Sequence, residues 1–296
     1  MKHAVLLGLA RLLQKLSVPG VRRLARFTGA AMWLLLFSRR KATIRRIAER
    51  LDVAEEQARS IARASFGHTA QSFLDILIAG KLGSPELPLI EGWQSAMERI
   101  ENTRRPIVLF TAHFGPWEIG ATFIGRSRQH DVLCVVRKQK DEAANQVIRL
   151  LRRENGLNTV DHRDVTGVVM EHLRKNGIVC FLADHNTPRK EALFIPFLGE
   201  TAAVTMGPAL LAVRAKAIVQ GCFIRREPDG SNSSFFLEPL DTALLQGSIK
   251  EKIRFVAEFY TAAIEEQIRS CPEQWFWIHN RWKTRPVAES QTLPSV

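Results

Sequence analysis

The sequence predicts an α/β fold in which helices flank a mainly parallel sheet (αβα), preceded by a basic N-terminal helical arm. Short apolar runs alternate with amphipathic helical segments from residue 107 onward, a pattern typical of parallel strands that are covered on both faces. Polar residues follow several of these runs, and open α/β sheets bind ligands beyond the carboxyl ends of their strands. A chain of 296 residues is long enough to bury a substantial core.

The first 50 residues carry nearly all of the net charge. They hold twelve Lys and Arg residues against one acid, Glu49, and so contribute eleven of the twelve net positive charges. Leucines recur at helical spacing in residues 3–18, and an uncharged run of twelve residues follows at 27–38. That run is too short for a membrane-spanning helix, which needs about 20 apolar residues. Leucines, Trp33 and flanking arginines are typical of a helix lying on an anionic membrane surface.

We therefore expect membrane-associating helices at 1–42, a main domain at 43–286 and a loose tail at 287–296. A helical hairpin that merely packs on the core remains an alternative. Arginines, not a small-residue cleavage site, follow the apolar run, which disfavours a secretory signal peptide. The density of leucine disfavours a nucleic-acid-binding arm, and we expect no nucleic-acid partner.

The elements of the main domain follow from periodicity and from helix and strand terminators. Residues 43–80 predict helices, with a break near Asp52. Pro106 directly precedes the apolar strand 107–110. At the start of a strand, the missing N–H of proline costs the fewest hydrogen bonds between strands. Further strands are expected at 131–137, 157–160, 178–183, 217–225 and 234–240. Further helices are expected at 141–156, at 164–177 starting from Asp164, at 201–215 and at 249–269. The four cysteines lack any C-x-x-C motif, so we expect buried free thiols in a reducing compartment.

The strand at 107–110 ends close to His113, which is the first candidate catalytic residue. Gly115 and Pro116 break the chain there, and Glu118 falls in the first turn of the next helix. Imidazole suits a general base near neutral pH, and a neighbouring carboxylate can fix its tautomer. Two side chains that are five residues apart on one straight helix point about 140° away from each other. The side chains of His113 and Glu118 can therefore meet only if the chain turns at Gly115 and Pro116. Alternatively, His113 is simply buried, and Glu118 is favoured by the helix dipole.

Two further strands end in polar residues. Arg137 ends the strand at 131–137, and Asp184, His185 and Asn186 follow the strand at 178–183. Together with His113 they are expected to share one crevice, although each could be a solvated strand end or a turn residue. The chain has no G-x-S-x-G, Walker, G-x-G-x-x-G or H-E-x-x-H motif and no zinc-ligand spacing. We therefore expect base catalysis with neither a metal ion nor a serine nucleophile.

These segments resemble a known family. Residues 113–118, HFGPWE, are similar to the H-x4-D/E signature of glycerolipid and lysophospholipid acyltransferases. Residues 184–212 resemble the bacterial lipid A late acyltransferases, with an Asp-His-x element, a Pro-Phe-x-Gly-like turn and a Thr-rich helix start. Residues 274–286, QWFWIHNRWKTRP, resemble the C-terminal run of the same enzymes. Order and spacing agree across residues 40–286, and the hydrophobic and basic arm also matches.

The resemblance implies a glycerolipid acyltransferase-like fold and an enzyme on the cytoplasmic face of the inner membrane. It would be held there peripherally or by a single N-terminal anchor. Such an enzyme moves a fatty acyl group from acyl carrier protein (ACP) to a hydroxyl of a lipid A precursor, with no cofactor beyond the acyl donor. Expected partners are therefore ACP, a glycolipid acceptor and the anionic membrane surface.

The resemblance also implies roles for individual residues. His113 would deprotonate the hydroxyl, and Glu118 would orient His113. Arg137 would bind phosphate or stabilise the oxyanion, and Asp184 would lie in the crevice. The basic residues of the C-terminal run would face phosphate or form a rim that attracts the donor: Arg281, Lys283 and Arg285.

Two departures leave the donor and the acceptor open. The Phe-Gly-Pro-Trp filling of the motif differs from that expected in lauroyl transferases, and the expected Asn-Leu-x-x-x-[FY]-P pattern is missing near Ile47. Another glycolipid acceptor, such as a mannosylated phosphoinositide, and an acyl-CoA donor remain alternatives. A catalytically silent membrane-binding scaffold is the alternative of another class.

Overall fold

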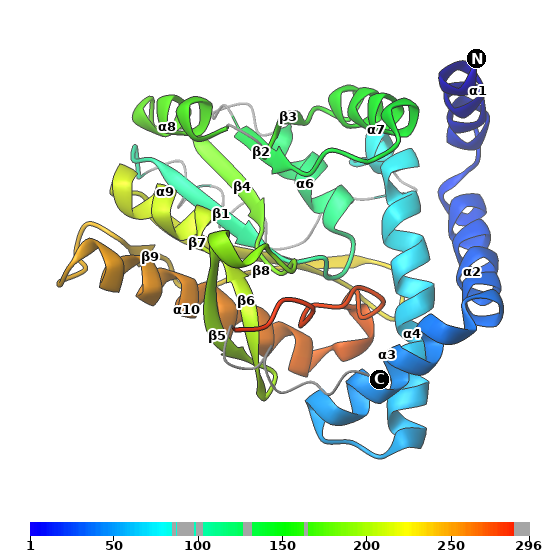
Figure 1. Ribbon diagram of the computed structural model, residues 1–296. Coiled ribbons are helices and arrows are strands. Elements are labelled where there is room, and N and C mark those ends of the chain that lie inside the picture. Colours follow the sequence, from blue (N-terminus) through cyan, green and yellow to red (C-terminus); the bar gives the residue numbers. More distant parts are fainter. Residues whose placement is uncertain (85–86, 88–97, 99–102, 127–131, 163–164, 287–296) are drawn as a thin grey trace.

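A seven-stranded sheet forms the centre of the computed structural model, which describes residues 1–84, 87, 98, 103–126, 132–162 and 165–286 (Figure 1). Strand β9 (Leu240–Asp241) pairs with β7, and the others run in the order β3 (Asn158–Asp161), β2 (Val132–Val136), β4 (Ile178–Leu182), β1 (Ile107–Thr111), β7 (Ile218–Arg226), β8 (Asn232–Phe236). The strands from β3 to β7 are parallel, whereas β8 and β9 are antiparallel to β7. The mainly parallel sheet predicted from the sequence is thus confirmed.

Helices cover both faces of this sheet. Helices α6 (Trp117–Gly125) and α7 (Glu142–Glu154) cover one face, and α8 (Thr166–Arg174), α9 (Gly207–Ala215) and α10 (Ile249–Ser270) cover the other (Figure 1). Alternate residues of β1 pack into the cores on the two faces of the sheet, because successive side chains of a strand point to opposite faces. Val108 and Phe110 join the core beneath α10, whereas Leu109 joins the core beneath α6.

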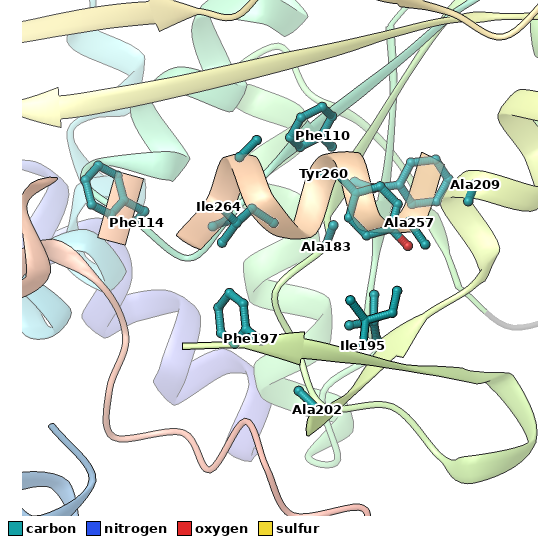
Figure 2. Packing of buried hydrophobic residues seen from close by; sticks show 14 of the residues in the cluster. Phe110, Phe114, Ala183, Ile195, Phe197, Ala202, Ala209, Ala257, Tyr260 and Ile264 are labelled. Atoms are coloured by element: carbon teal, nitrogen blue, oxygen red, sulfur yellow. The ribbon is translucent and has the colours of Figure 1, made fainter. Parts of the chain in front are cut away.

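The larger core lies between the sheet and α10. Figure 2 shows Tyr260 and Ile264 of α10 between Phe110 of β1 and Phe197. The Tyr260 side chain is fully buried, and its hydroxyl donates a hydrogen bond to the carbonyl of Thr205. A buried phenol needs such a partner, since an unpaired polar group in the core is costly.

A β-hairpin replaces the first part of the helix predicted at 201–215. Strands β5 (Ala192–Phe197) and β6 (Glu200–Thr205) pair antiparallel, and α9 starts only at Gly207. Leu198 and Gly199 between them have φ of 50° and 76°, as a two-residue hairpin turn requires. The helix prediction was wrong there because pairing with β5 and three β-branched residues outweigh the helix preference of two alanines: Thr201, Val204 and Thr205.

The single strand predicted at 234–240 is instead two strands, β8 and β9, whereas the remaining predicted elements are present with shifts at their ends. Helix α7 is capped by the Asp141 carboxylate, which accepts from the amide of Ala144. Its C-cap is Asn155, followed by Gly156 with φ of 91°. The strand predicted at 131–137 is β2, with Asp131 outside the described residues. The helix predicted from Asp164 is α8, and Asp164 itself also lies outside the described residues.

Residues 2–81, which include the N-terminal arm, form a series of helices joined by short turns. Helices α1 (Lys2–Gln14), α2 (Val18–Leu35), α3 (Phe37–Leu51) and α4 (Glu55–Leu74) are followed by the short 3₁₀ turns η1 (Asp75–Leu77) and η2 (Ala79–Lys81). Helix α2 lies along α4, and α1 contacts α7 (Figure 1). None of the helices in the described ranges is long and apolar enough to cross a bilayer. Large apolar side chains nevertheless remain exposed along the arm: Val5, Leu9, Leu12, Phe27, Leu34, Leu35 and Phe37.

These helices are consistent with a peripheral arm. The division of the chain at residues 42 and 286 stays a prediction, and the tail at 287–296 lies outside the described residues.

Candidate active site

His113 and Asp184 come together because their strands are neighbours in the sheet. β1 pairs with β4 in a parallel register that places Thr111 opposite Leu182. Each chain then runs two residues further, which brings His113 and Asp184 to the same point beyond the carboxyl ends. The sequence predicted both residues at this edge, and the register makes them direct partners.

Asp184 holds His113 by both its backbone and its ring. The backbone N–H of His113 donates to Asp184 Oδ2 at 2.9 Å, and the ring atom Nδ1 lies 2.8 Å from Oδ1. Burial raises the pKa of the Asp184 carboxyl, but the His113 ring and the hydrogen bonds outweigh it and hold this pKa well below its ordinary value. The carboxylate is therefore ionised, so Nδ1 carries the proton and Nε2 has a free lone pair. This is the tautomer that a general base needs.

The same carboxylate changes the proton affinity of the ring. Burial alone lowers the pKa of His113, but the charge of Asp184 and its hydrogen bond more than offset this, and the net pKa is raised. Two further histidines, His185 and His279, lie close to Asp184. Burial lowers the pKa of both, that of His279 to about 4. Of these three histidines, only His113 has Asp184 as its hydrogen-bond partner.

The C-terminal run completes the surroundings of the pair. Trp275 Nε1 donates to Asp184 Oδ2 at 2.8 Å, and the ring of Phe276 lies 6.0 Å from that of His113. On the other side the ring of Trp117 packs edge-on against His113 at 5.3 Å. The imidazole is therefore fixed by one hydrogen bond and two aromatic contacts. A quarter of its side chain remains exposed.

The turn after His113 requires glycine. Gly115 has φ of 57°, and a Cβ atom there would lie 1.9 Å from the carbonyl oxygen of Ile224. Its amide donates to the Gln274 carbonyl at 3.0 Å, and its own carbonyl accepts from the Ser72 hydroxyl at 2.7 Å. The turn is thus clamped between β7, α4 and the C-terminal run.

Glu118, which the sequence analysis expects to orient His113, has another hydrogen-bond partner in the structure. Its two carboxylate oxygens bind Arg152 of α7 instead, at 2.5 and 3.2 Å. No hydrogen bond joins Glu118 to His113 in the part of the chain that the structure describes. The reason is geometric: α6 starts at Trp117 after the Gly115 turn, so Glu118 points toward α7 while Asp184 occupies Nδ1. Glu118 still acts on His113 through its charge, which adds to the rise of that pKa.

The Glu118–Arg152 pair lies in the wall of an apolar cavity of about 70 Å³. The cavity lies between α6 and the sheet, and Phe114, next to His113, lines it as well. Apart from the ion pair its lining is almost entirely apolar, including three thiols: Cys134, Cys180 and Cys222. All four cysteines of the chain are free, as predicted. Cys180 and Cys271 are only partly buried.

The remaining predicted site residues make no hydrogen bond to this pair in the described part of the chain. Arg137 and Lys283 are exposed. Arg281 is 1% exposed and donates to the Ala203 carbonyl at 2.7 Å, and burial lowers its pKa to about 10. The expectation that Arg281 lies on a rim is therefore wrong, because its guanidinium packs over Phe197 inside the molecule. Arg285 pairs with Glu200.

Arg152 and Trp275 were missed as site residues. Trp275 stands inside the C-terminal run that carries the resemblance, which was an available signal. Arg152 is one of several arginines of an ordinary amphipathic helix, and only the fold distinguishes it. No group of three or more potential metal ligands occurs among the described residues.

Comparison with known proteins agrees with the resemblance. The profile of a family described as bacterial lipid A biosynthesis acyltransferase matches residues 3–284. The chain is 27% identical over 188 residues to the lipid A biosynthesis lauroyltransferase of Escherichia coli (strain K12), covering 63% of this chain and 59% of that protein. It is 27% identical over 202 residues to the palmitoleoyltransferase of the same strain, covering 68% and 63%. A lipid A biosynthesis acyltransferase of Haemophilus influenzae is 27% identical over 196 residues, covering 65% and 60%. The matches thus span about three fifths of the length of these relatives.

Proposed function

The chain belongs to the bacterial lipid A biosynthesis acyltransferase family, and from this membership we propose that it transfers a fatty acyl group to a hydroxyl of a lipid A precursor. The observation that carries the proposal is the His113–Asp184 pair beside an apolar cavity. Its free Nε2 provides a base, and the cavity provides room for hydrocarbon.

In the proposed reaction Nε2 of His113 takes the proton of the acceptor hydroxyl as the oxygen attacks the thioester carbonyl carbon. The tetrahedral intermediate then collapses, its carbon–sulfur bond breaks, and the protonated imidazole returns the proton to the leaving thiolate. The products are an ester and a free thiol. Asp184 stabilises the imidazolium formed between the two steps, and a positioned base of this kind contributes about 10²–10⁴-fold to the rate.

We propose separate roles for the cavity and its ion pair. The apolar lining beneath α6 takes the acyl chain, because burying methylenes there removes them from water. Arg152, fixed by Glu118, places a positive charge at the polar part of this wall. That charge can stabilise the oxygen that becomes negative during the attack. Glu118 is then a positioning residue for Arg152.

We further propose that the donor is acyl-ACP and that the acceptor is reached from the cytoplasmic face of the inner membrane. A carrier protein is acidic, and the net charge of +12 would attract it at a rate that falls with ionic strength. Arg137 and Lys283 remain candidates for contact with the donor because both are exposed. No metal ion enters the proposed steps.

The test is acyl transfer from labelled acyl-ACP and from acyl-CoA to a lipid A precursor, at several salt concentrations and with EDTA. The proposal expects a labelled lipid A product, preference for acyl-ACP that shrinks as salt rises, and activity that survives EDTA. Equal kcat/KM for both donors at every salt concentration would assign the donor to coenzyme A. Acylation of another glycolipid from a total lipid extract, but not of the lipid A precursor, would contradict the proposed acceptor.

A further inference from the structure

A second cavity, of about 660 Å³, opens between α2, α4 and the start of the β7–β8 turn. None of its lining residues also lines the apolar cavity beneath α6. Five arginines line it, and we call it the arginine groove: Arg22, Arg23, Arg26, Arg225 and Arg226. Only two acidic residues, Glu227 and Glu273, share this lining. The acyl-transfer chemistry proposed above uses none of these residues.

Two of the arginines, Arg22 and Arg226, are held in place by contacts that use only part of their N–H donors. Arg226 binds Asp75 at 2.7 Å through one terminal nitrogen and His68 Nδ1 at 3.1 Å through the other. Arg22 donates to the Gly230 carbonyl at 2.8 Å. A guanidinium has five N–H donors, so each keeps donors for a ligand.

Arg225 is the most informative of the five. Its guanidinium lies over the ring of Phe235 at 4.6 Å and donates to the Ser270 hydroxyl at 3.0 Å. Its Nε is buried and has no hydrogen-bond partner in the described part of the chain. A buried N–H without an acceptor costs free energy.

The groove is electrostatically unbalanced. Burial lowers the pKa of Arg226, Asp75 offsets part of this, and the charge of Arg22 lowers it further, so the two arginines repel each other. Burial, together with the charge of Arg226, lowers the pKa of His68 to about 4. His68 is therefore neutral, and it must accept from Arg226 through Nδ1. The tautomer with a proton on Nε2 adds another donor to a groove that already has an excess of donors and positive charge.

The groove also lies next to the exposed apolar surface of the arm. Arg23 and Arg26 are exposed on α2, and the adjoining Phe27 is 75% exposed. An occupant with a phosphate could thus place that group among the arginines and its hydrocarbon beside Phe27. Arginine is suited to phosphate because its planar fork binds two oxygens at once.

We propose that the arginine groove binds the phosphate headgroup of an anionic membrane lipid, at a site separate from the acyl cavity. Phosphate neutralises the repulsion between the arginines and gives acceptors to their unused donors. The apolar neighbours of the groove assign this phosphate to a lipid and not to free inorganic phosphate.

The test is calorimetric titration of the full chain with soluble probes. Dihexanoyl phosphatidic acid, kept below its micelle-forming concentration, offers the headgroup without a membrane surface, and inorganic phosphate offers the anion alone. The lipid is expected to bind in a one-to-one complex and at least tenfold more tightly than inorganic phosphate. Equal affinity would assign the groove to free phosphate and overturn the lipid assignment. No acyl donor is present, so the outcome does not depend on acyl transfer.

Variants connect the binding to the groove. The double variant Arg23→Gln/Arg26→Gln changes two exposed side chains, and we expect it to weaken lipid binding about tenfold to thirtyfold, at about 1 kcal/mol per arginine. Arg225→Gln should weaken it as well. Arg39→Gln/Lys41→Gln removes the same charge from exposed positions outside the groove and should change the affinity less than twofold. No detectable binding of the lipid, or equal losses in the groove and control variants, would overturn the proposal.

Discussion

At the scale of single residues, the central feature is the carboxylate that faces His113. Asp184 accepts from the His113 backbone, from its ring and from Trp275. A carboxylate with three donors stays ionised, and an ionised partner fixes the proton on Nδ1. The basicity of Nε2 therefore depends on Asp184 more than on Glu118.

This dependence gives the first prediction. His113 must be neutral to act as a base, and its raised pKa places the acidic fall of kcat/KM at a higher pH than an ordinary histidine would give. Asp184→Asn removes the charge that raises this pKa while burial, which lowers it, remains. The plateau of kcat/KM should drop about 10²–10⁴-fold and its acidic limb should move to lower pH.

The pH profile of the Asp184→Asn variant checks this directly. Asp161→Asn, at the edge strand β3, is the matched control and should leave the profile unchanged. If Glu118→Gln, and not Asp184→Asn, moved the acidic limb, Glu118 would be the orienting residue after all.

Sequence reasoning predicted this site in part. An apolar strand followed by His113 and a Gly-Pro turn was sufficient to predict the position of His113 at the end of a strand. Asp184 was also predicted at the same edge of the sheet. That it pairs with His113 follows only from the register between β1 and β4, and local sequence does not reveal which strands are neighbours. Glu118 appeared to be the partner because it is near in sequence, whereas the turn at Gly115 directs it toward α7.

At the scale of elements, the packing of α6 on the sheet creates the apolar cavity that we propose for the acyl chain. Gly120 of α6 faces Ile224, and a Cβ atom there would lie 2.1 Å from its Cδ1. Helix α6 therefore lies close to β7. The cavity lies between α6 and the neighbouring strands β2 and β4, which contribute small side chains such as Cys134 and Cys180. The size of these thiols should therefore limit the length of the acyl chain.

The second prediction concerns that limit. Cys180→Phe adds a side chain large enough to fill the cavity, so the variant should prefer shorter donors than the wild type prefers. Overpacking costs about 1–3 kcal/mol of stability, and the fold must be checked by its melting temperature. Competition between acyl donors of graded length measures the preference.

Cys180→Ser keeps the size of the side chain and should leave the preferred length unchanged. An unaltered preference in a folded Cys180→Phe protein would show that the chain binds elsewhere.

Most elements were predictable because their periodicity is strong, as in α7 and α10. The β5–β6 hairpin was not, since its second strand contains alanines and continues directly into α9. Residues 200–205 form a strand because they pair with β5, and the sequence of one segment alone does not reveal its pairing partner.

At the scale of the whole molecule, the arm presents apolar and basic surface together. Leu34 and Leu35 are 69% and 80% exposed at the end of α2, and Arg39 and Lys41 follow on α3. This combination predicts binding at the surface of an anionic membrane, where each basic residue contributes about 1 kcal/mol. Leucines at helical spacing, Trp33 and the flanking arginines are what lead to this prediction from the sequence.

The third prediction tests that surface by sedimentation with vesicles. The full chain should bind vesicles of phosphatidylcholine with anionic phosphatidylglycerol, and salt should release it. Leu34→Gln/Leu35→Gln should weaken binding tenfold or more, because two apolar side chains no longer enter the interface. Phe255→Gln, at a half-exposed position of α10, is the control and should bind normally. Equal binding to neutral and anionic vesicles would rule out the electrostatic contribution.

The most direct test of the account is the rate of acyl transfer to a lipid A precursor by the His113→Ala variant. His162→Ala, at an exposed position beyond β3, is the matched control. We predict that His113→Ala loses at least a hundredfold in kcat while its melting temperature stays near that of the wild type, and that His162→Ala retains full activity. Activity of His113→Ala within tenfold of the wild type would contradict the assignment of His113 as the base.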